Sequence, residues 1–266
     1  MRVVPILSAL CMLTPMLSAS ERVFSYVEQS TVAPVGAKEV EVWSTYRRGH
    51  AGESFARQDN RLELEVGIVE GVQTAIYLNQ TRITVDGISE TESSISWEWK
   101  WQLSDPAADS FGSALYTEAT VGSDEMSLEA KYIIDKQLGA NDVIAAHVQL
   151  EPEWHTAPGD FALVEWETVL ASGWSHRIGQ HWRAGLELRL ATDIEEETAA
   201  NGSSEWEVAS SALFLGPNIH AQFGTFWFTG TVLPQIYAFE GATGDDQRDL
   251  THQERVQIRF IAGINF

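Results

Sequence analysis

Cysteine is almost absent from this chain of 266 residues, and the single one, Cys11, lies within the first 19. Those residues carry an early positive charge at Arg2, then an apolar run, then the small residues Ser18 and Ala19. This pattern is typical of a secretory signal peptide, here residues 1–19. Lipidation of Cys11 is disfavoured because a large residue, Leu10, precedes it. We therefore expect cleavage after Ala19 and an exported chain without disulfides, held together by hydrogen bonds and packing.

Long hydrophobic runs and positive charge are also scarce. After residue 19 nothing approaches the roughly 18 consecutive apolar residues of a membrane helix, which excludes a helical membrane protein. The chain has 17 basic and 38 acidic residues, and its net charge of −21 repels nucleic acid, which is therefore not an expected partner. Tryptophan, in contrast, is plentiful. Ten Trp against four Met indicate a surface where an apolar phase meets water.

Apolar and polar residues alternate with period two through most of the chain, which predicts β-strands and not helices. In SISWEWKWQLS (94–104), the residues Trp97, Trp99 and Trp101 share one face, and Glu98 and Lys100 share the other. Twelve such segments are predicted, at 38–47, 60–69, 72–83, 94–104, 110–120, 126–137, 142–151, 161–172, 180–191, 204–215, 219–233 and 253–266. The alternation is weakest in 110–120 and 204–215, so the count ranges from ten to fourteen.

The predicted connections alternate in length. Short ones are expected near 70–71, 105–109, 138–141, 173–179 and 216–218, and generally longer polar ones at 48–59, 84–93, 121–125, 152–160, 192–203 and 238–252. An even number of strands of about ten residues, with short turns at one end and longer loops at the other, is typical of a transmembrane β-barrel. A closed sheet leaves no backbone group unpaired in lipid. The tryptophan face would then meet lipid. A soluble secreted β-sandwich is the alternative fold.

The last strand, RVQIRFIAGINF, ends on Phe266 and is apolar at every second position back to Val256. It resembles the C-terminal strand of bacterial outer-membrane β-barrel proteins, which implies that the barrel-assembly machinery recognises Phe266. The stretch GPNIHAQFGTFWFTGTVLPQ (216–235) is similar to uncharacterised families described as outer-membrane transporters, and no functional residue is carried over from them. With the strand pattern, this predicts a bacterial outer-membrane barrel over 38–266 with both termini periplasmic. Residues 20–37 would be a periplasmic lead-in or a partial plug.

Charged side chains fall on the predicted interior face, because in hydrocarbon each would cost a few kcal/mol. The lumen-lining candidates are Arg61, Glu63, Glu65, Glu98, Lys100, Glu129, Lys131, His147, Glu165, Glu167, Arg183, Glu187, Arg189, Glu205, Glu207 and Arg259. The membrane-girdle candidates are Trp97, Trp99, Trp101, Trp166, Trp174 and Trp182.

Three functions are compatible with this pattern. The first is a channel or transporter for an unidentified small solute, biased toward cations because carboxylates raise the local cation concentration. The second is a non-conducting structural or surface-interaction barrel, whose charges form an internal ion-pair network. The third is a lipid or peptide hydrolase. The size of the barrel does not decide between an open and a plugged lumen. Barrels of about eight strands are filled by side chains and those of about sixteen enclose an aqueous channel, and twelve strands lie between the two.

Catalytic residues are not predicted, because the chain has neither a GxSxG nor an HExxH motif. His50, His155 and His252 fall in predicted loops. His147, predicted to point inward beside Glu151, would be the first histidine to mutate. The acidic runs DIEEE (193–197) and GDDQRD (244–249) lack the spacing of a calcium loop, so no metal or other cofactor is predicted. The expected partners are outer-membrane lipid, the assembly machinery and the small solute.

Overall fold

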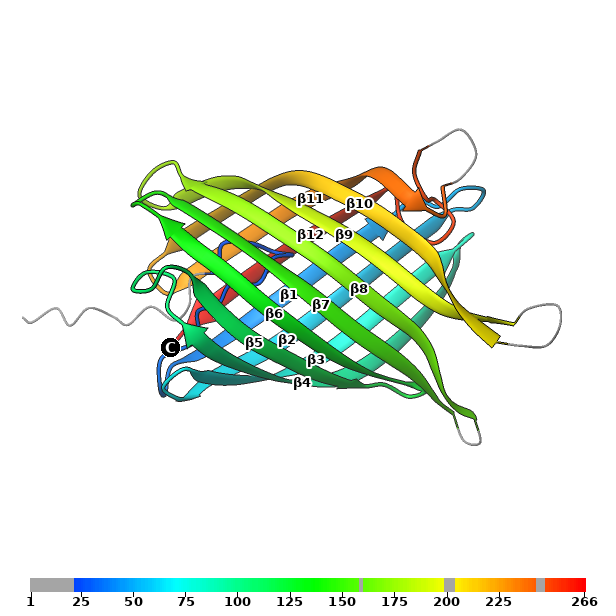
Figure 1. Cartoon of the computed structure of the whole chain (residues 1–266), viewed down its shortest axis with the longest axis horizontal. Coiled ribbons are helices and arrows are strands. Elements are labelled where there is room, and N and C mark those ends of the chain that lie inside the picture. Colours follow the sequence, from blue (N-terminus) through cyan, green and yellow to red (C-terminus); the bar gives the residue numbers. More distant parts are fainter. Residues whose placement is uncertain (1–21, 158–159, 199–203, 243–246) are drawn as a thin grey trace, which may run out of the picture.

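The computed structural model describes residues 22–157, 160–198, 204–242 and 247–266. Its strands are β1 Lys38–Arg48, β2 Phe55–Val69, β3 Val72–Val85, β4 Ile88–Ser104, β5 Gly112–Val121, β6 Glu125–Leu138, β7 Asp142–Ala157, β8 Asp160–Arg177, β9 Trp182–Thr198, β10 Ser204–Phe223, β11 Phe226–Glu240 and β12 Val256–Asn265. Each pairs antiparallel with its neighbours in sequence, and β12 pairs with β1 (Figure 1). The predicted closed antiparallel barrel of twelve strands is thus confirmed. The predicted signal peptide lies outside the described residues.

The barrel closes at the seam between β1 and β12. Their register runs from Glu39 opposite Asn265 to Arg48 opposite Val256. The backbones of Lys38 and Phe266 exchange two hydrogen bonds, of 3.2 and 2.9 Å, where the seam ends. We call this end of the barrel the terminal end and the opposite end the loop end. Among the described residues no helix is long and apolar enough to cross a membrane.

Several strands continue past their predicted ends, which shortens the connections at the loop end. β3 and β4 are joined only by Asp86 and Gly87, where a loop over 84–93 was predicted. Both residues have positive φ, 49° and 84°, as a two-residue hairpin turn requires, and Asp-Gly is a favoured pair for it. β7 likewise continues to Ala157, beyond the predicted end at residue 151.

The predicted break at 216–218 is wrong, because β10 runs through Gly216 and Pro217 and turns only at Gly224. β9 pairs with β10 throughout this stretch, with Pro217 opposite Leu186. The ladder to β11 skips residues 215–217, and a Cβ on Gly216 would collide with the carbonyl of Val232. Proline is tolerated in a strand where the ladder to a neighbour is already interrupted.

On β2, β3 and β4 the outer surface is apolar toward the terminal end and polar toward the loop end. Leu62, Leu78 and Ile95 lie side by side on β2, β3 and β4, and each is about half exposed. Two residues further toward the loop end, the outward row is polar, with Asn60, Gln80 and Ser93. We call the apolar zone the outer belt. Beyond it, these three strands continue as a sheet that is polar on its outer face.

Candidate functional site

The barrel interior is lined by many charged and polar side chains. Of the predicted lumen residues, seven are buried on inward faces: Glu63, Glu65, Glu98, Lys100, His147, Arg183 and Glu187. Seven more also face inward but are partly exposed: Arg61, Glu129, Lys131, Glu165, Glu167, Arg189 and Arg259. Glu205 and Glu207 are exposed, near the start of β10 at the loop end. Three further buried acids, Glu39, Glu41 and Glu118, also face inward. They are absent from the predicted lumen residues, although the alternation of apolar and polar residues places them on the same face.

Acidic residues lie directly opposite one another on neighbouring strands. The register pairs Glu39 with Glu65 and Glu41 with Glu63 between β1 and β2. We call these four residues, together with Glu98 of β4, the acidic wall; all five are buried. Like charges facing each other destabilise a sheet, so the acidic wall requires neutralising or hydrogen-bonding partners.

Most of the acidic wall has hydrogen-bond donors. The indole N–H of Trp43 donates to Glu41 at 2.7 Å, and Trp227 donates to Glu39. Gln73 bridges Glu65 and Glu98 at 2.7 and 3.1 Å. Glu63 is the exception, since within the described residues no N–H or hydroxyl donor reaches its oxygens, and its side-chain hydrogen-bond partner is another acid, Glu41.

Three further interior acids are paired with bases. Arg61 makes two hydrogen bonds to Glu118, of 3.2 and 3.0 Å. Lys131 pairs with Glu129 at 2.6 Å, and Arg189 pairs with Glu167. This part of the interior is the ion-pair network that a charged lumen requires.

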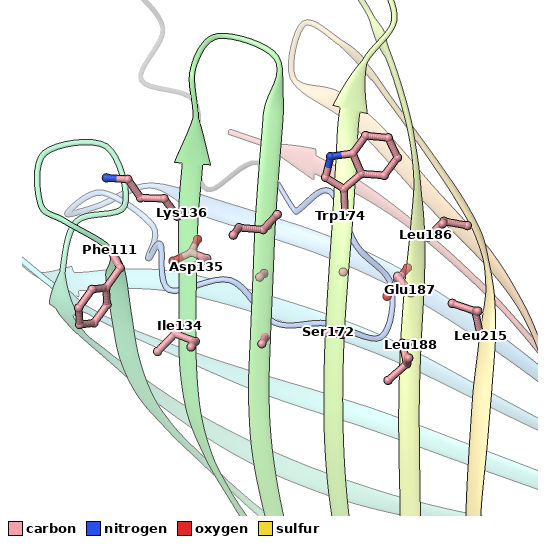
Figure 2. A pocket seen from close by; sticks show the side chains of 14 residues that line it. Phe111, Ile134, Asp135, Lys136, Ser172, Trp174, Leu186, Glu187, Leu188 and Leu215 are labelled. Carbon is pink, nitrogen blue, oxygen red and sulfur yellow. The ribbon is translucent and has the colours of Figure 1, made fainter. Parts of the chain in front are cut away.

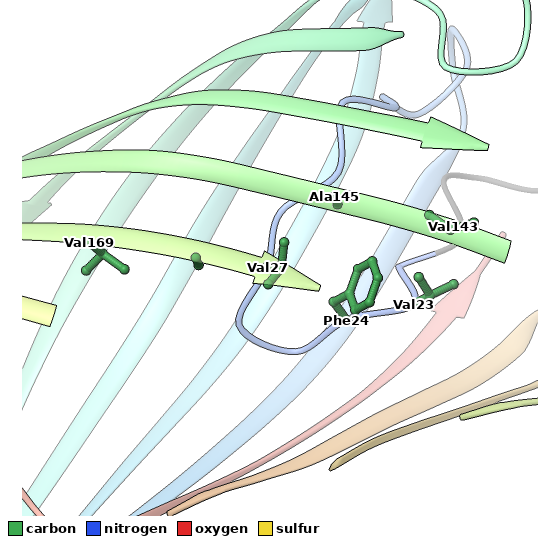
Figure 3. Close-up of a cluster of buried hydrophobic side chains, with 7 residues drawn as sticks. Val23, Phe24, Val27, Val143, Ala145 and Val169 are labelled. Carbon is green, nitrogen blue, oxygen red and sulfur yellow. The ribbon is translucent and has the colours of Figure 1, made fainter. Parts of the chain in front are cut away.

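The N-terminal segment, residues 22–37, lies inside the barrel (Figures 1 and 3). Val23, Phe24 and Val27 of this segment form one buried cluster with inward residues of β7 and β8: Val143, Ala145, Val169 and Ala171. The ring of Phe24 packs against Gly173, where a Cβ would be only 2.7 Å from it. This segment thus packs against inward-facing side chains of the barrel wall, and its role as a periplasmic lead-in or a partial plug stays a prediction.

Glu187 holds this segment in place. Its carboxylate accepts hydrogen bonds from three successive backbone N–H groups, those of Ser25, Tyr26 and Val27, at 3.0, 2.7 and 3.0 Å. Successive backbone N–H groups form a concave anion site. Asn218 donates at 3.0 Å and Thr231 also donates, and Glu187 is completely buried. This predicted lumen residue is therefore an anchor for the N-terminal segment, a role that alternation cannot reveal.

Two further inward side chains bind the same segment. His147 Nδ1 accepts the backbone N–H of Glu28 at 3.1 Å, and the Gln73 side-chain oxygen accepts that of Ala33 at 2.8 Å. The Glu28 carboxylate lies 3.1 Å from Arg22 and 3.8 Å from Lys100. Burial by itself would raise the pKa of Glu28, but these positive charges outweigh burial and hold that pKa below its ordinary value.

The other histidines do not converge on a common centre. His50 stacks on Phe55 and contacts Glu53 at 3.0 Å, whereas His252 contacts Asp249 at 3.1 Å. In the parts of the chain that the structure describes, no three His, Cys, Asp or Glu side chains are placed to hold a metal ion.

The six predicted girdle tryptophans all lie on outward faces. Trp97, Trp99 and Trp101 follow one another along β4, with ring centroids 5.6 and 6.1 Å apart. Trp174 rims an apolar outer groove of about 540 Å³ across β6 to β10, together with Ile144 and Leu186 (Figure 2). The groove is hollow because small residues such as Ser172 line it. These features belong to the outer belt and not to the charged interior.

Comparison with known proteins identifies a sequence family and several structures with a similar fold. The model of a family of unknown function, DUF6662, matches residues 16–266. No curated protein sequence matches. The chain is similar to the NanC porin, with a TM-score of 0.53 and 11% identity over 85% of this chain and 98% of that one. It is also similar to the KdgM porin, with a TM-score of 0.52 and 8% identity over 86% and 99%. A second KdgM structure, with a TM-score of 0.50 at 8% identity over 86% and 98%, is in complex with disordered oligogalacturonate.

Proposed function

The chain belongs to the DUF6662 family, and we propose that it is a bacterial outer-membrane channel for small solutes, with its N-terminal segment inside the lumen. The observation that carries this proposal is the division of the closed sheet into an apolar outer belt and a charged, hydrogen-bonding interior. In a membrane, only a closed sheet or a helix satisfies its own backbone. The porin fold of the structural neighbours supports the same function.

We further propose that the channel favours cations. Five carboxylates of the acidic wall are buried on the inward face, and Lys100 is the one buried base on the same strands, β1, β2 and β4. Carboxylates along a narrow path concentrate cations and repel anions. Oligogalacturonate, which one KdgM structure contains, is an acidic ligand, so this lumen suits a different class of solute.

Planar-bilayer recordings test the channel. Glu187→Ala, which removes the acceptor of three N–H groups, should loosen the N-terminal segment and give larger and more frequent conductance steps than the parent protein. In a gradient of KCl, the reversal potential should report potassium passing in preference to chloride. A matched control is Glu196→Ala on the same strand, whose side chain is exposed and should not change conductance.

The opposite results would change the conclusion. Silence from folded Glu187→Ala protein at all voltages and salt concentrations would favour the non-conducting structural barrel, whose charges only pair internally. Chloride selectivity would leave the channel in place and remove the cation preference.

A further inference from the structure

Trp43 is surrounded by guanidinium groups inside the barrel. The Arg22 guanidinium lies 4.5 Å from the centroid of its ring, and those of Arg61 and Arg259 lie 5.5 Å from it. Arg61 and Arg259 also stack on tyrosines, at 4.3 Å from Tyr77 and 4.1 Å from Tyr26. An aromatic face attracts cations through its quadrupole, and a flat guanidinium stacks on it best.

Carboxylates complete the surroundings of Arg22. One oxygen of Glu41 accepts the Trp43 indole N–H, and the other lies 3.8 Å from Arg22 Nε. Both oxygens of Glu28 accept from Arg22 Nη2, at 3.1 and 3.2 Å. Arg22 therefore lies on an aromatic face with carboxylates at its edge, which is the geometry that recognises a guanidinium.

The acids near this position exceed what Arg22 alone can neutralise. Glu63 lies opposite Glu41 in the register, is 1% exposed, and its negative charge acts on Arg22. As noted above, no N–H or hydroxyl donor in the described chain reaches its oxygens, and its side-chain partner is the acid Glu41. A buried carboxylate without a donor requires a cation or a proton.

Arg22 comes from the N-terminal segment, whereas Trp43, Glu41 and Glu63 belong to the barrel wall. Its side chain is 13% exposed, so solvent reaches this position. We propose that Trp43, Glu41 and Glu63 form a binding site for solutes that carry a guanidinium group, and that Arg22 occupies this site as an internal ligand. The inference rests on the proposed channel and names the class of solute that it takes.

A planar organic cation fits this site better than a metal ion. Calcium and magnesium require several oxygen ligands around one point, and no such group of three side chains is found in the described chain. A compact ammonium carries fewer and less directional donors than a guanidinium, and it stacks less well. The site should therefore prefer arginine amide to lysine amide.

Isothermal titration calorimetry of the full-length protein in detergent tests the site, with arginine amide as the probe. Arg22→Gln removes the internal ligand and takes away the guanidinium that acts on Glu41 and Glu63, so it should bind the probe at least about tenfold more tightly than the parent protein. Adding Glu63→Gln or Trp43→Leu to Arg22→Gln should reverse most of this gain. The matched control adds Glu90→Gln, an exposed acid of β4, and should keep the gain.

Circular dichroism and heat-dependent migration on gels establish that each variant is folded. If either Glu63→Gln or Trp43→Leu does not fold, the other still tests the site. The inference is overturned if Arg22→Gln binds no more tightly than the parent, or if lysine amide binds equally well. It is also overturned if the variant takes up protons and not the probe. Because calorimetry needs no conductance, a silent bilayer with intact binding would remove only the channel, and conductance without binding would remove only the guanidinium site.

Discussion

At the scale of single residues, Glu187 shows the difference between locating a side chain and knowing its role. Alternation in 180–191 places it inward beside Arg183 and Arg189. The structure adds that its carboxylate is completely buried and accepts hydrogen bonds from a segment 160 residues away in sequence. A carboxylate with so many donors is an anchor, because losing it leaves buried N–H groups without acceptors.

Glu187→Ala should therefore release the N-terminal segment. The expected cost is about 1–3 kcal/mol for each buried donor left unsatisfied, enough to shift the docked population by about tenfold or more. The single cysteine of the sequence, Cys11, lies in the predicted signal peptide, so after the expected cleavage Val27→Cys introduces a unique and buried thiol. Its rate of maleimide labelling should rise at least about tenfold when Glu187→Ala is added.

Glu196→Ala in the same Val27→Cys background is the control, because Glu196 is exposed and should leave the labelling rate unchanged. Equal labelling rates in all three proteins would show that Glu187 does not hold the segment.

At the scale of elements, the sequence predicts the number of strands but fixes their ends less well, and the predicted strand 219–233 spans the turn between β10 and β11. Period two is a strong signal within the outer belt, where one face must be apolar. Beyond the belt both faces are polar, so the pattern fades although the backbone pairing continues, as in β4 from Ile88 to Ser93. The Gly216-Pro217 pair predicts a turn because turns favour these residues, but the strand continues through it where the ladder to β11 is already interrupted.

Two glycines of the same hairpin should respond differently to an added methyl group. Gly216→Ala would drive its Cβ into the carbonyl of Val232, whereas a Cβ at Gly230 meets Phe260 at an ordinary 3.6 Å. Overpacking of this kind costs about 1–3 kcal/mol. In urea titrations of the folded barrel, Gly216→Ala should lower the unfolding midpoint and Gly230→Ala should leave it close to the parent value. Equal midpoints would mean that the β10–β11 gap is not a tight contact.

At the scale of the whole molecule, the sequence predicts a barrel but not what occupies it. Alternation assigns each side chain to one of two faces, and the closed sheet follows from the number and length of the strands. The sequence of residues 22–37 does not predict that their backbone binds Glu187, His147 and Gln73. These partners are distant in sequence, and polar contacts of this kind follow no periodic pattern. The contacts between the N-terminal segment and the interior are therefore the part that only three-dimensional structure supplies.

The orientation of the molecule follows from the distribution of polar surface between its two ends. The strands at the loop end extend past the outer belt with polar outward residues, such as Asn60 and Gln80, which hydrocarbon does not tolerate. In outer-membrane barrels the longer loops face outward and the short turns face the periplasm. We therefore expect the loop end outside the cell and both termini in the periplasm.

Cysteine substitutions at the two ends of β6 check this orientation, since Ser123 and Ala140 are both exposed and lie in the connections before and after that strand. A maleimide carried on a polymer too large to cross the outer membrane should label Ser123→Cys in intact cells. It should label Ala140→Cys only after the outer membrane is opened, because that turn lies at the terminal end. The reverse pattern would place the termini outside, and the polar extensions of β2, β3 and β4 would then have to lie on the periplasmic side.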